Sequence, residues 1–368
     1  MRINNISTHV MYNYNRQTLM QQKKDFLEAN YELVNGRVPD IGLALGGKIG
    51  RFLNIENQQS LLNELKITNG LIAERMAAGQ IAIKSLVYAP RSNESEPEGA
   101  LVRFNKILLG ASSGKATSRS LTKEAQLALD VFVSALNTNI DGEFVFGGAN
   151  TNEPPLTYYK AGSDEGASKI VRDEFRGYFG FSPDDSAAAS ITKEQMQEFI
   201  DGPFSDLFED PSWGINFSKA DDIPQRNSIS PDGVVVDTSV SANKDAFRQA
   251  MKSLILVAEF SEAGLSEDAV AAVEEGARNS SSASIGSAIN KISIVSSHLG
   301  SLENRIQSAT EQIESQLTLL QDLRMRFIGI DQNEAAARLE EIKLMIAVSN
   351  GLTVQISRLS LVNYLSVR

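Results

Sequence analysis

The hydrophobic pattern of residues 284–368 predicts two long helices with one break between them. In the first helix, apolar residues recur at steps of three and four. That spacing is the seam of a coiled coil rather than the broader face of a globular helix. The seam consists of Ile285, Ile289, Ile292, Val295, Leu299, Leu302, Ile306, Ala309, Ile313, Leu317 and Leu320. One helix cannot bury such a seam alone, so another segment of this chain or of a second copy must lie along it.

The break between these helices is predicted at residues 329–331, Gly-Ile-Asp. Asp331 suits an N-cap, and Glu334 stands at the third helical position of a capping box. The second helix continues the seam and closes on the segment Leu-Val-Asn-Tyr-Leu at 361–365. Its apolar positions are Leu339, Ile342, Met345, Ile346, Leu352, Ile356 and Leu359.

The N-terminal third of the chain is also helical in pattern. Helices are predicted over residues 3–34, 51–88, 100–109 and 122–139. The first ends where Asn-Gly and then Pro follow it, which is a typical helix stop. In the second helix, a polar position at Thr68 or Asn69 interrupts the apolar stripe, and such a position can set the register of a coiled coil.

The pattern changes over residues 141–241, which are rich in glycine, proline, aspartate and aromatic residues. Strands are predicted at 168–172 and 233–237, and a helix at 192–200 that begins with a Thr192–Gln195 capping box. The aromatic residues between Tyr158 and Trp213 are expected to form the core of this compact α+β segment. Helices resume at 242–263 and at 266–278, where Ser266 is the expected N-cap.

The order of helices, α+β insertion and helices predicts a mainly α fold. The N- and C-terminal segments are expected to form a long coiled-coil helical hairpin with the α+β insertion at its tip. We expect three domains: residues 1–40 with 330–368 as a terminal coiled-coil assembly domain, 41–145 with 242–329 as a helical rod, and 146–241 as the outward insertion.

Composition excludes several classes of protein. The formal net charge of −11 argues against nucleic acid or an anionic membrane as the main partner. There is no cysteine, so disulfides, thiolate catalysis and cysteine-based zinc sites are excluded. No apolar run approaches the ~20 residues that span a bilayer. The N-terminus has no continuous apolar core of a cleaved signal peptide, so we expect secretion, if any, without cleavage.

Candidate chemical motifs are weak. Residues 42–48, Gly-Leu-Ala-Leu-Gly-Gly-Lys, have the spacing of a phosphate-binding loop, but Ile49 stands where Ser or Thr would bind Mg²⁺. No strand pattern precedes them, so a joint between two helices is the better interpretation. The two histidines, His9 and His298, share no carboxylate neighbourhood in the sequence.

Acidic pairs occur at 184–185, 221–222 and 340–341, without the spacing of an EF-hand. They are expected to be solvated surface. Nothing assembles a nucleophile, a base and an orienting group. We therefore predict no enzymatic activity, no catalytic residues, no cofactor and no metal.

Three segments carry a resemblance to known proteins. The first segment is Met-Arg-Ile-Asn at 1–4 with Glu-Leu-Val-Asn-Gly-Arg at 32–37. The second is Leu-Asn-Thr-Asn-Ile-Asp-Gly-Glu-Phe-Val-Phe-Gly-Gly at 136–148, before the insertion. The third is Asp331, Glu334 and Ala335 with Ser-Leu-Val-Asn-Tyr-Leu at 360–365. In their order and spacing, these segments resemble the bacterial flagellin superfamily, and within it most closely the proteins of the hook–filament junction, over more than half of the chain.

One segment of this sequence differs from the usual sequence of filament flagellins. Filament flagellins usually carry a Ser-Asp-Asp/Asn-Pro-like stretch after the Gly-Lys/Arg signature. Here residues 38–46 read Val-Pro-Asp-Ile-Gly-Leu-Ala-Leu-Gly. The difference favours the junction proteins over the filament subunit.

The resemblance implies a structural subunit of the bacterial flagellum that joins hook to filament. It would be exported by the flagellar apparatus, would assemble outside the cell through its terminal helices, and would contact copies of itself, flagellin and other hook-associated proteins. An export chaperone is also implied. The side chains expected to pack between subunits are Ile3, Ile6, Met11, Leu19, Leu33, Leu339, Ile342, Ile346, Leu352, Ile356, Leu359, Leu361 and Leu365.

Three alternatives stay open. One is a flagellin that polymerises into the filament itself. Another is a coiled-coil secretion-tip or adaptor protein, whose helical hairpin would be stable in the monomer. The last is an enzyme whose active site lies in the aromatic part of the insertion.

Overall fold

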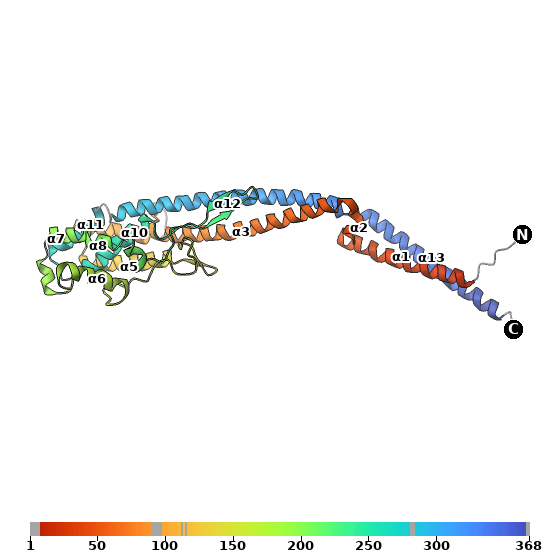
Figure 1. Ribbon diagram of the computed structural model, residues 1–368, viewed down its shortest axis with the longest axis horizontal. Coiled ribbons are helices and arrows are strands. Elements are labelled where there is room, and N and C mark those ends of the chain that lie inside the picture. The colour runs from red at the N-terminus through yellow and green to blue at the C-terminus, as the bar shows by residue number, and fades with distance from the viewer. Residues whose placement is uncertain (1–7, 90–97, 112, 115, 280–283, 366–368) are drawn as a thin grey trace. The chain divides into compact units, whose positions relative to one another are not determined.

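The computed structural model describes residues 8–89, 98–111, 113, 114, 116–279 and 284–365, and the fold is mainly α (Figure 1). The long helices are α1 (Thr8–Asn35), α3 (Ile49–Val87), α12 (Ile285–Ile328) and α13 (Gln332–Leu365). The chain divides into two compact units, one formed by Met1–Glu64 with Ile313–Arg368 and the other by Leu65–Gln312. The three domain boundaries expected from the sequence stay a prediction.

The terminal unit contains a pair of antiparallel helices from opposite ends of the chain, α1 and α13. Helix α1 lies along α13 (Figure 1), and the chain directions are opposed because Asn15 contacts Ser349 while Glu32 pairs with Arg338. At the closed end, the Val38 N–H donates to the Ile328 carbonyl at 3.0 Å. The predicted pairing of N- and C-terminal helices is therefore confirmed.

Residues 40–48 form a helical joint between α1 and α3. Helix α2 (Ile41–Leu45) begins at Asp40, whose carboxylate accepts from the Leu43 N–H at 2.9 Å, and a 3-10 turn, η1 (Gly46–Lys48), leads into α3. At the matching C-terminal break, Asp331 accepts from the Asn333 N–H at 2.8 Å, as expected of an N-cap. The glycine-rich segment 42–48 therefore lies in α2 and η1 and joins α1 to α3.

The second unit is built around a helix that is buried on almost every side, α10 (Asp245–Phe260). It packs against α5 (Ser118–Leu136) and α11 (Glu267–Asn279). Helix α4 (Ala100–Ala111) packs on α5, and the C-terminal half of α3 and the N-terminal half of α12 lie alongside. The seam residues Ile292, Leu299 and Ile306 of α12 are buried in this common core, so part of the seam is covered within the chain.

The insertion is more helical than the sequence predicted. Residues 168–172, expected as a strand, lie in α6 (Gly166–Phe179), so that prediction is wrong. Val171 and Phe175 are buried one helical turn apart. Residues 168–172 alone are too short to show that helical spacing. The predicted capping box Thr192–Gln195 opens α7 (Lys193–Asp201) as expected.

The remaining elements of the insertion are short. They are η2 (Ser186–Ser190), α8 (Pro203–Asp206), α9 (Ser212–Asn216) and the antiparallel hairpin of β3 (Arg226–Ser228) with β4 (Val235–Asp237). Another antiparallel hairpin, β1 (Asn139–Ile140) with β2 (Glu143–Phe144), lies just before the insertion. Strand β4 lies within the predicted 233–237, whereas β3 was not predicted.

Aromatic rings form the core of the insertion, as the sequence indicated. Phe175 stacks on Phe260 of α10 with ring centroids 5.3 Å apart, and Phe199 contacts both rings edge-on. Trp213 is fully buried, and its indole N–H donates to Asn243 at 2.7 Å. These contacts fix the insertion directly on the central helix α10.

Two glycines of α3 differ in how closely other elements approach them. A Cβ added at Gly79 would lie 3.2 Å from Val145 and 3.4 Å from Leu299, whereas one added at Gly70 meets nothing within 4 Å.

Alanine favours a helix over glycine by about 1 kcal/mol. Gly70→Ala is expected to gain about that amount in the free energy of unfolding. Gly79→Ala is expected to be about 1–3 kcal/mol less stable than Gly70→Ala, because it overpacks the contact. Urea unfolding of both variants measures the difference, and equal gains would contradict the close packing of α12 on α3.

Candidate assembly interface

The terminal helix pair buries few large side chains within the chain. Its buried cluster consists of Ala29, Leu339 and Ile342, with Phe26, Leu33 and Ile346 packed against it. A second small cluster, Leu45, Phe52 and Ile328, closes the end of the unit. Among the described residues of the unit these two clusters are small, so the apolar packing of α1 on α13 contributes little stability by itself.

A polar link lies inside the terminal pair. Asn15 is buried, and its side-chain amide donates to the Ser349 carbonyl at 3.1 Å and to the Thr353 hydroxyl at 2.6 Å. A buried amide on a helical seam favours one register, because any slip leaves it without partners. This link fixes α1 against α13 where apolar burial is thin.

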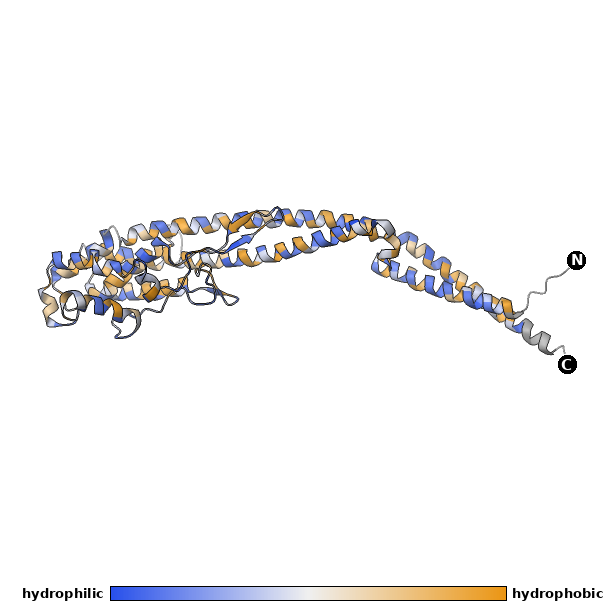
Figure 2. Ribbon diagram, in the orientation of Figure 1, coloured by the Kyte–Doolittle hydropathy of each residue, from blue (hydrophilic) through white to orange (hydrophobic). Residues whose placement is uncertain are grey.

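The outer faces of the terminal unit carry many exposed apolar side chains. They are Val10, Met11, Tyr12, Tyr14, Met20, Leu27, Val34, Leu43, Leu53, Leu61, Leu319, Met325, Leu344, Met345, Val348, Leu352 and Val354. Figure 2 shows hydrophobic and hydrophilic positions alternating along both α1 and α13. Single exposed apolar residues are ordinary on a protein surface. Repeated along two paired helices, they form an apolar surface of the kind that marks a protein–protein interaction site.

The residues predicted to pack between subunits fall into several groups. Leu339 and Ile342 are buried inside the pair, and Leu33 and Ile346 lie partly buried against them. Leu19 and Ile356 are half-buried, whereas Met11 and Leu352 are exposed and open to a neighbour. Ile3 and Ile6 lie outside the described residues. The side chains of Leu359, Leu361 and Leu365 also lie outside them. The subunit contact itself stays a prediction for all of these residues.

Several exposed apolar residues of α1 and α13 were not predicted from the sequence. Val34, Leu344 and Val348 were not on the predicted packing surface, and Asn15 was not identified as buried. The seam pattern marks the face that turns toward the nearest helix, so it selects inner positions first. A count of apolar residues off the seam would have pointed to the outer face.

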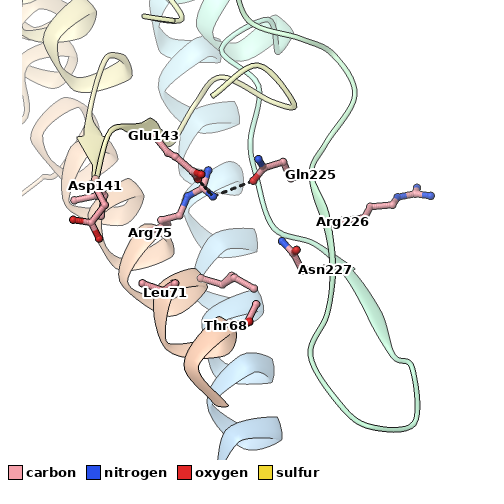
Figure 3. Close-up of a pocket in the computed structure, with 10 residues that line it drawn as sticks. Thr68, Leu71, Arg75, Asp141, Glu143, Gln225, Arg226 and Asn227 are labelled. Carbon is pink, nitrogen blue, oxygen red and sulfur yellow. Dashed lines mark hydrogen bonds and ion pairs between the residues drawn. The ribbon is translucent and has the colours of Figure 1, made fainter. Parts of the chain in front are cut away.

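A hollow of about 500 Å³ lies beside α3 in the second unit, lined by both hairpins. Arg75 crosses it and donates through Nη1 to Glu143 at 2.6 Å and to Gln225 at 3.0 Å (Figure 3). Asn69, which the sequence singled out as a polar seam position, is buried and donates to the Ile229 carbonyl at 2.9 Å. The hollow is therefore spanned by side chains that tie the hairpins to the rod.

A buried carboxylate holds the insertion to α10. Glu259 accepts from the Tyr159 hydroxyl at 2.8 Å, the Ser168 hydroxyl at 2.6 Å and the Gly162 N–H at 3.2 Å. Burial raises the pKa of Glu259 although these donors lower it, and burial beside Glu259 raises the pKa of Tyr159 well above its ordinary value. All three donors come from residues 159–168, so the carboxylate ties this segment of the insertion to α10.

A buried lysine lies on the same helix. Lys252 donates to the Ser205 hydroxyl at 2.5 Å, and burial lowers its pKa to about 8, against the attraction of Asp201, Glu209 and Asp206. A serine beside a lysine of low pKa occurs in some hydrolases. Both side chains are buried here, so substrate has no route to the pair.

The low pKa of Lys252 makes stability depend on pH. The unfolded chain, with a lysine pKa of 10.5, holds the proton more tightly than the folded chain, so this lysine costs stability at neutral pH. That cost falls as pH rises from about 8. Between pH 8 and 9.5, the free energy of unfolding of the wild-type protein is therefore expected to rise by about 2 kcal/mol relative to that of Lys252→Met. Urea titrations at each pH measure the difference, and a constant difference would contradict a desolvated ammonium.

The described residues contain no group of three or more histidine or acidic side chains that could hold a metal. None of the helices in this part of the chain is long and apolar enough to cross a membrane. The acidic pairs expected at the surface have local partners. Asp184 pairs with Arg172, and Glu340 pairs with Lys343 at 2.6 Å.

Comparison with known proteins gives two findings. Residues 283–365 match the family model of the bacterial flagellin C-terminal helical region. Among solved structures, a putative flagellar hook-associated protein from Vibrio parahaemolyticus is similar, with 13% sequence identity over 74% of this chain and 94% of that chain and a TM-score of 0.48. No curated protein matches the sequence.

Proposed function

We propose that the chain is a structural subunit of the bacterial flagellum that joins hook to filament, of the hook-associated protein 3 type. Two independent properties of the C-terminal region support this proposal. Residues 283–365 are similar to the flagellin C-terminal helical region, and α13, which makes up much of that region, forms with α1 a pair that leaves its outer apolar side chains uncovered.

The energetics favour assembly over a lone terminal pair. Full burial of a Leu- or Met-sized side chain contributes about 1.5–3 kcal/mol. Several such side chains per subunit are exposed on α1 and α13, so burying them against neighbours would outweigh the ordering cost of association. The contacts must be head-to-tail, because only heterologous interfaces build an open helical or tubular array.

The choice of the junction over the filament rests on the sequence. Residues 38–46 lack the stretch that is usual in filament flagellins, and the segment 144–148 before the insertion resembles the junction proteins. The partners proposed with this role are copies of the chain, flagellin and another hook-associated protein, with a chaperone that holds the terminal helices before export. The protein would act outside the cell.

The role is tested by adding labelled purified protein to isolated hooks and filaments and locating it by electron microscopy. A junction subunit is expected to bind in a short collar at the distal end of the hook. Continued growth into long filaments would instead identify a filament flagellin. Failure to bind hooks, filaments or itself would overturn the flagellar proposal. A chain truncated before residue 330 is the matched control and is expected not to bind.

A further inference from the structure

The second unit has a shallow apolar groove between α3 and α5. It has a volume of about 520 Å³. Its lining is mostly small, with Ala78, Ala82, Ser85, Val131, Ser134 and Ala135. Small side chains let another backbone approach closely, and the volume lies within the ~300–1,000 Å³ of typical binding pockets.

One side chain gives the groove a charge. Asp130 of α5 lines it and has no ion-pair partner among the residues that the structure describes. The groove therefore suits an aliphatic segment that carries a positive charge beside it.

The β3–β4 hairpin, residues 226–237, presents such a segment. Val236 points inward and is buried, whereas the strand alternation turns Val235 and Arg226 to the outer face. Val235 is 55% exposed, and Ile223 just before the hairpin is 66% exposed. Arg226 pairs with the exposed Asp237 at 3.0 Å, and an exposed ion pair of this kind contributes little stability.

The hairpin is held rigidly to the rod. Arg75 donates to Gln225 just before β3, and Asn69 donates to the Ile229 carbonyl just after it. Its outer face therefore has one fixed geometry, and little conformational entropy is lost when it binds a partner.

We propose that the β3–β4 hairpin of one copy docks in the α3–α5 groove of the next copy. Val235 would cover the small groove residues, and Arg226 would pair with the neighbour's Asp130. The inference rests on the proposed function, because it requires that copies assemble. It adds a contact made by the insertion to those made by the terminal helices.

The two surfaces are placed for a head-to-tail contact. On α3, Asn69 under the hairpin and Ile81 at the groove are about 18 Å apart along the axis and about a third of a turn apart around it. Because the surfaces differ in position and direction, one copy uses its hairpin on the next and receives another hairpin in its own groove. Such an interface propagates along an array, whereas reciprocal docking of two copies would close a twofold dimer; a cross-linked ladder, rather than a dimer alone, distinguishes the array.

The absence of cysteine allows a direct test by disulfide cross-linking. Val235→Cys and Ser134→Cys are made separately, both at exposed positions, and circular dichroism checks that each folds. The two variants are mixed, assembled on isolated hooks and oxidised. The mixture is expected to give a cross-linked dimer, which neither variant gives alone. The double variant is expected to give a ladder of higher species, since each copy then carries both halves of the contact.

Ile215→Cys, mixed with Ser134→Cys, is the matched control at an even more exposed apolar position outside the hairpin. It is expected to give no dimer. Binding to hooks without the Val235–Ser134 dimer would overturn the docking inference and leave the proposed function standing. Failure of the wild-type protein to assemble on hooks or with itself would overturn both.

The charge pair gives a second readout. Arg226→Asp alone is expected to weaken assembly about tenfold. Mixing it with Asp130→Arg is expected to restore most of the loss, because every hairpin faces a groove of opposite charge when the two variants alternate. No recovery in the mixture, with both variants folded, would contradict the assigned pair.

Discussion

Replacing Leu344 by Asp is expected to abolish assembly while leaving the fold of the monomer unchanged. Leu344 lies on the outer face of α13 with 70% of its surface exposed, so the carboxylate is solvated in the monomer. In an array the same position is covered, and the interface loses the burial of a leucine and must bury a charge instead. A loss of about 3–4 kcal/mol corresponds to at least a hundredfold weaker association. Sedimentation of the assembled fraction measures it.

The control for this variant is Ile215→Asp in α9. Ile215 is 76% exposed, so the same substitution changes the surface charge equally without touching the terminal helices. It is expected to sediment with the wild-type protein. Normal assembly of Leu344→Asp, or equal loss in both variants, would mean that the outer face of α13 is not the subunit interface.

The terminal unit could be predicted from the sequence because its signals are local. The step of three and four residues in 285–320 and 339–359 defines helices without any tertiary information. Caps such as Asp331 then fix where those helices begin. What the pattern could not decide is the partner of each residue. Leu339 is buried within the chain and Leu352 is exposed, although both stand on the same predicted seam.

The insertion was harder to predict because its elements are short and their contacts are long-range. The strand expected at 168–172 is a helix, since Val171 and Phe175 turn toward Phe260, which lies far along the chain. The pairing of β3 with β4 joins two weakly apolar segments, and nothing in Arg226–Ser228 indicates a strand by itself. Tertiary packing therefore overrides local propensity in this part of the molecule.

The buried polar groups of α10 had no signal at all in the sequence. Glu259 is surrounded by donors from residues 91–100 positions earlier in the chain, so no local spacing marks it. The aromatic core around it was predicted from composition alone, as a gathering of rings. The position of a carboxylate within that core depends on how α6 packs against α10, which only the folded chain determines.

Replacing Glu259 by Ala is expected to produce the largest loss of stability of any substitution considered, about 3–5 kcal/mol. The change leaves the Tyr159 hydroxyl, the Ser168 hydroxyl and the Gly162 N–H without their acceptor in a buried site, and it removes a carboxylate that lies 3.8 Å from Arg172. Unsatisfied buried donors keep their full desolvation cost, so the loss exceeds that of an ordinary hydrogen bond. Urea unfolding followed by the fluorescence of the single tryptophan, which is buried in the same unit, measures the change.

Two variants separate this explanation from a general sensitivity of the region to mutation. Glu259→Gln keeps one acceptor oxygen at the site and is expected to lose less than half as much stability as the alanine variant. Glu262→Ala, three residues on, removes only an exposed ion pair with Arg119 and is expected to change stability by at most about 1 kcal/mol. If Glu259→Ala lost no more than Glu262→Ala, the carboxylate would not be what fixes the insertion to α10. The insertion would then be held by its aromatic rings alone, and a rigid β3–β4 hairpin presented to a neighbour would have to depend on Asn69 and Arg75.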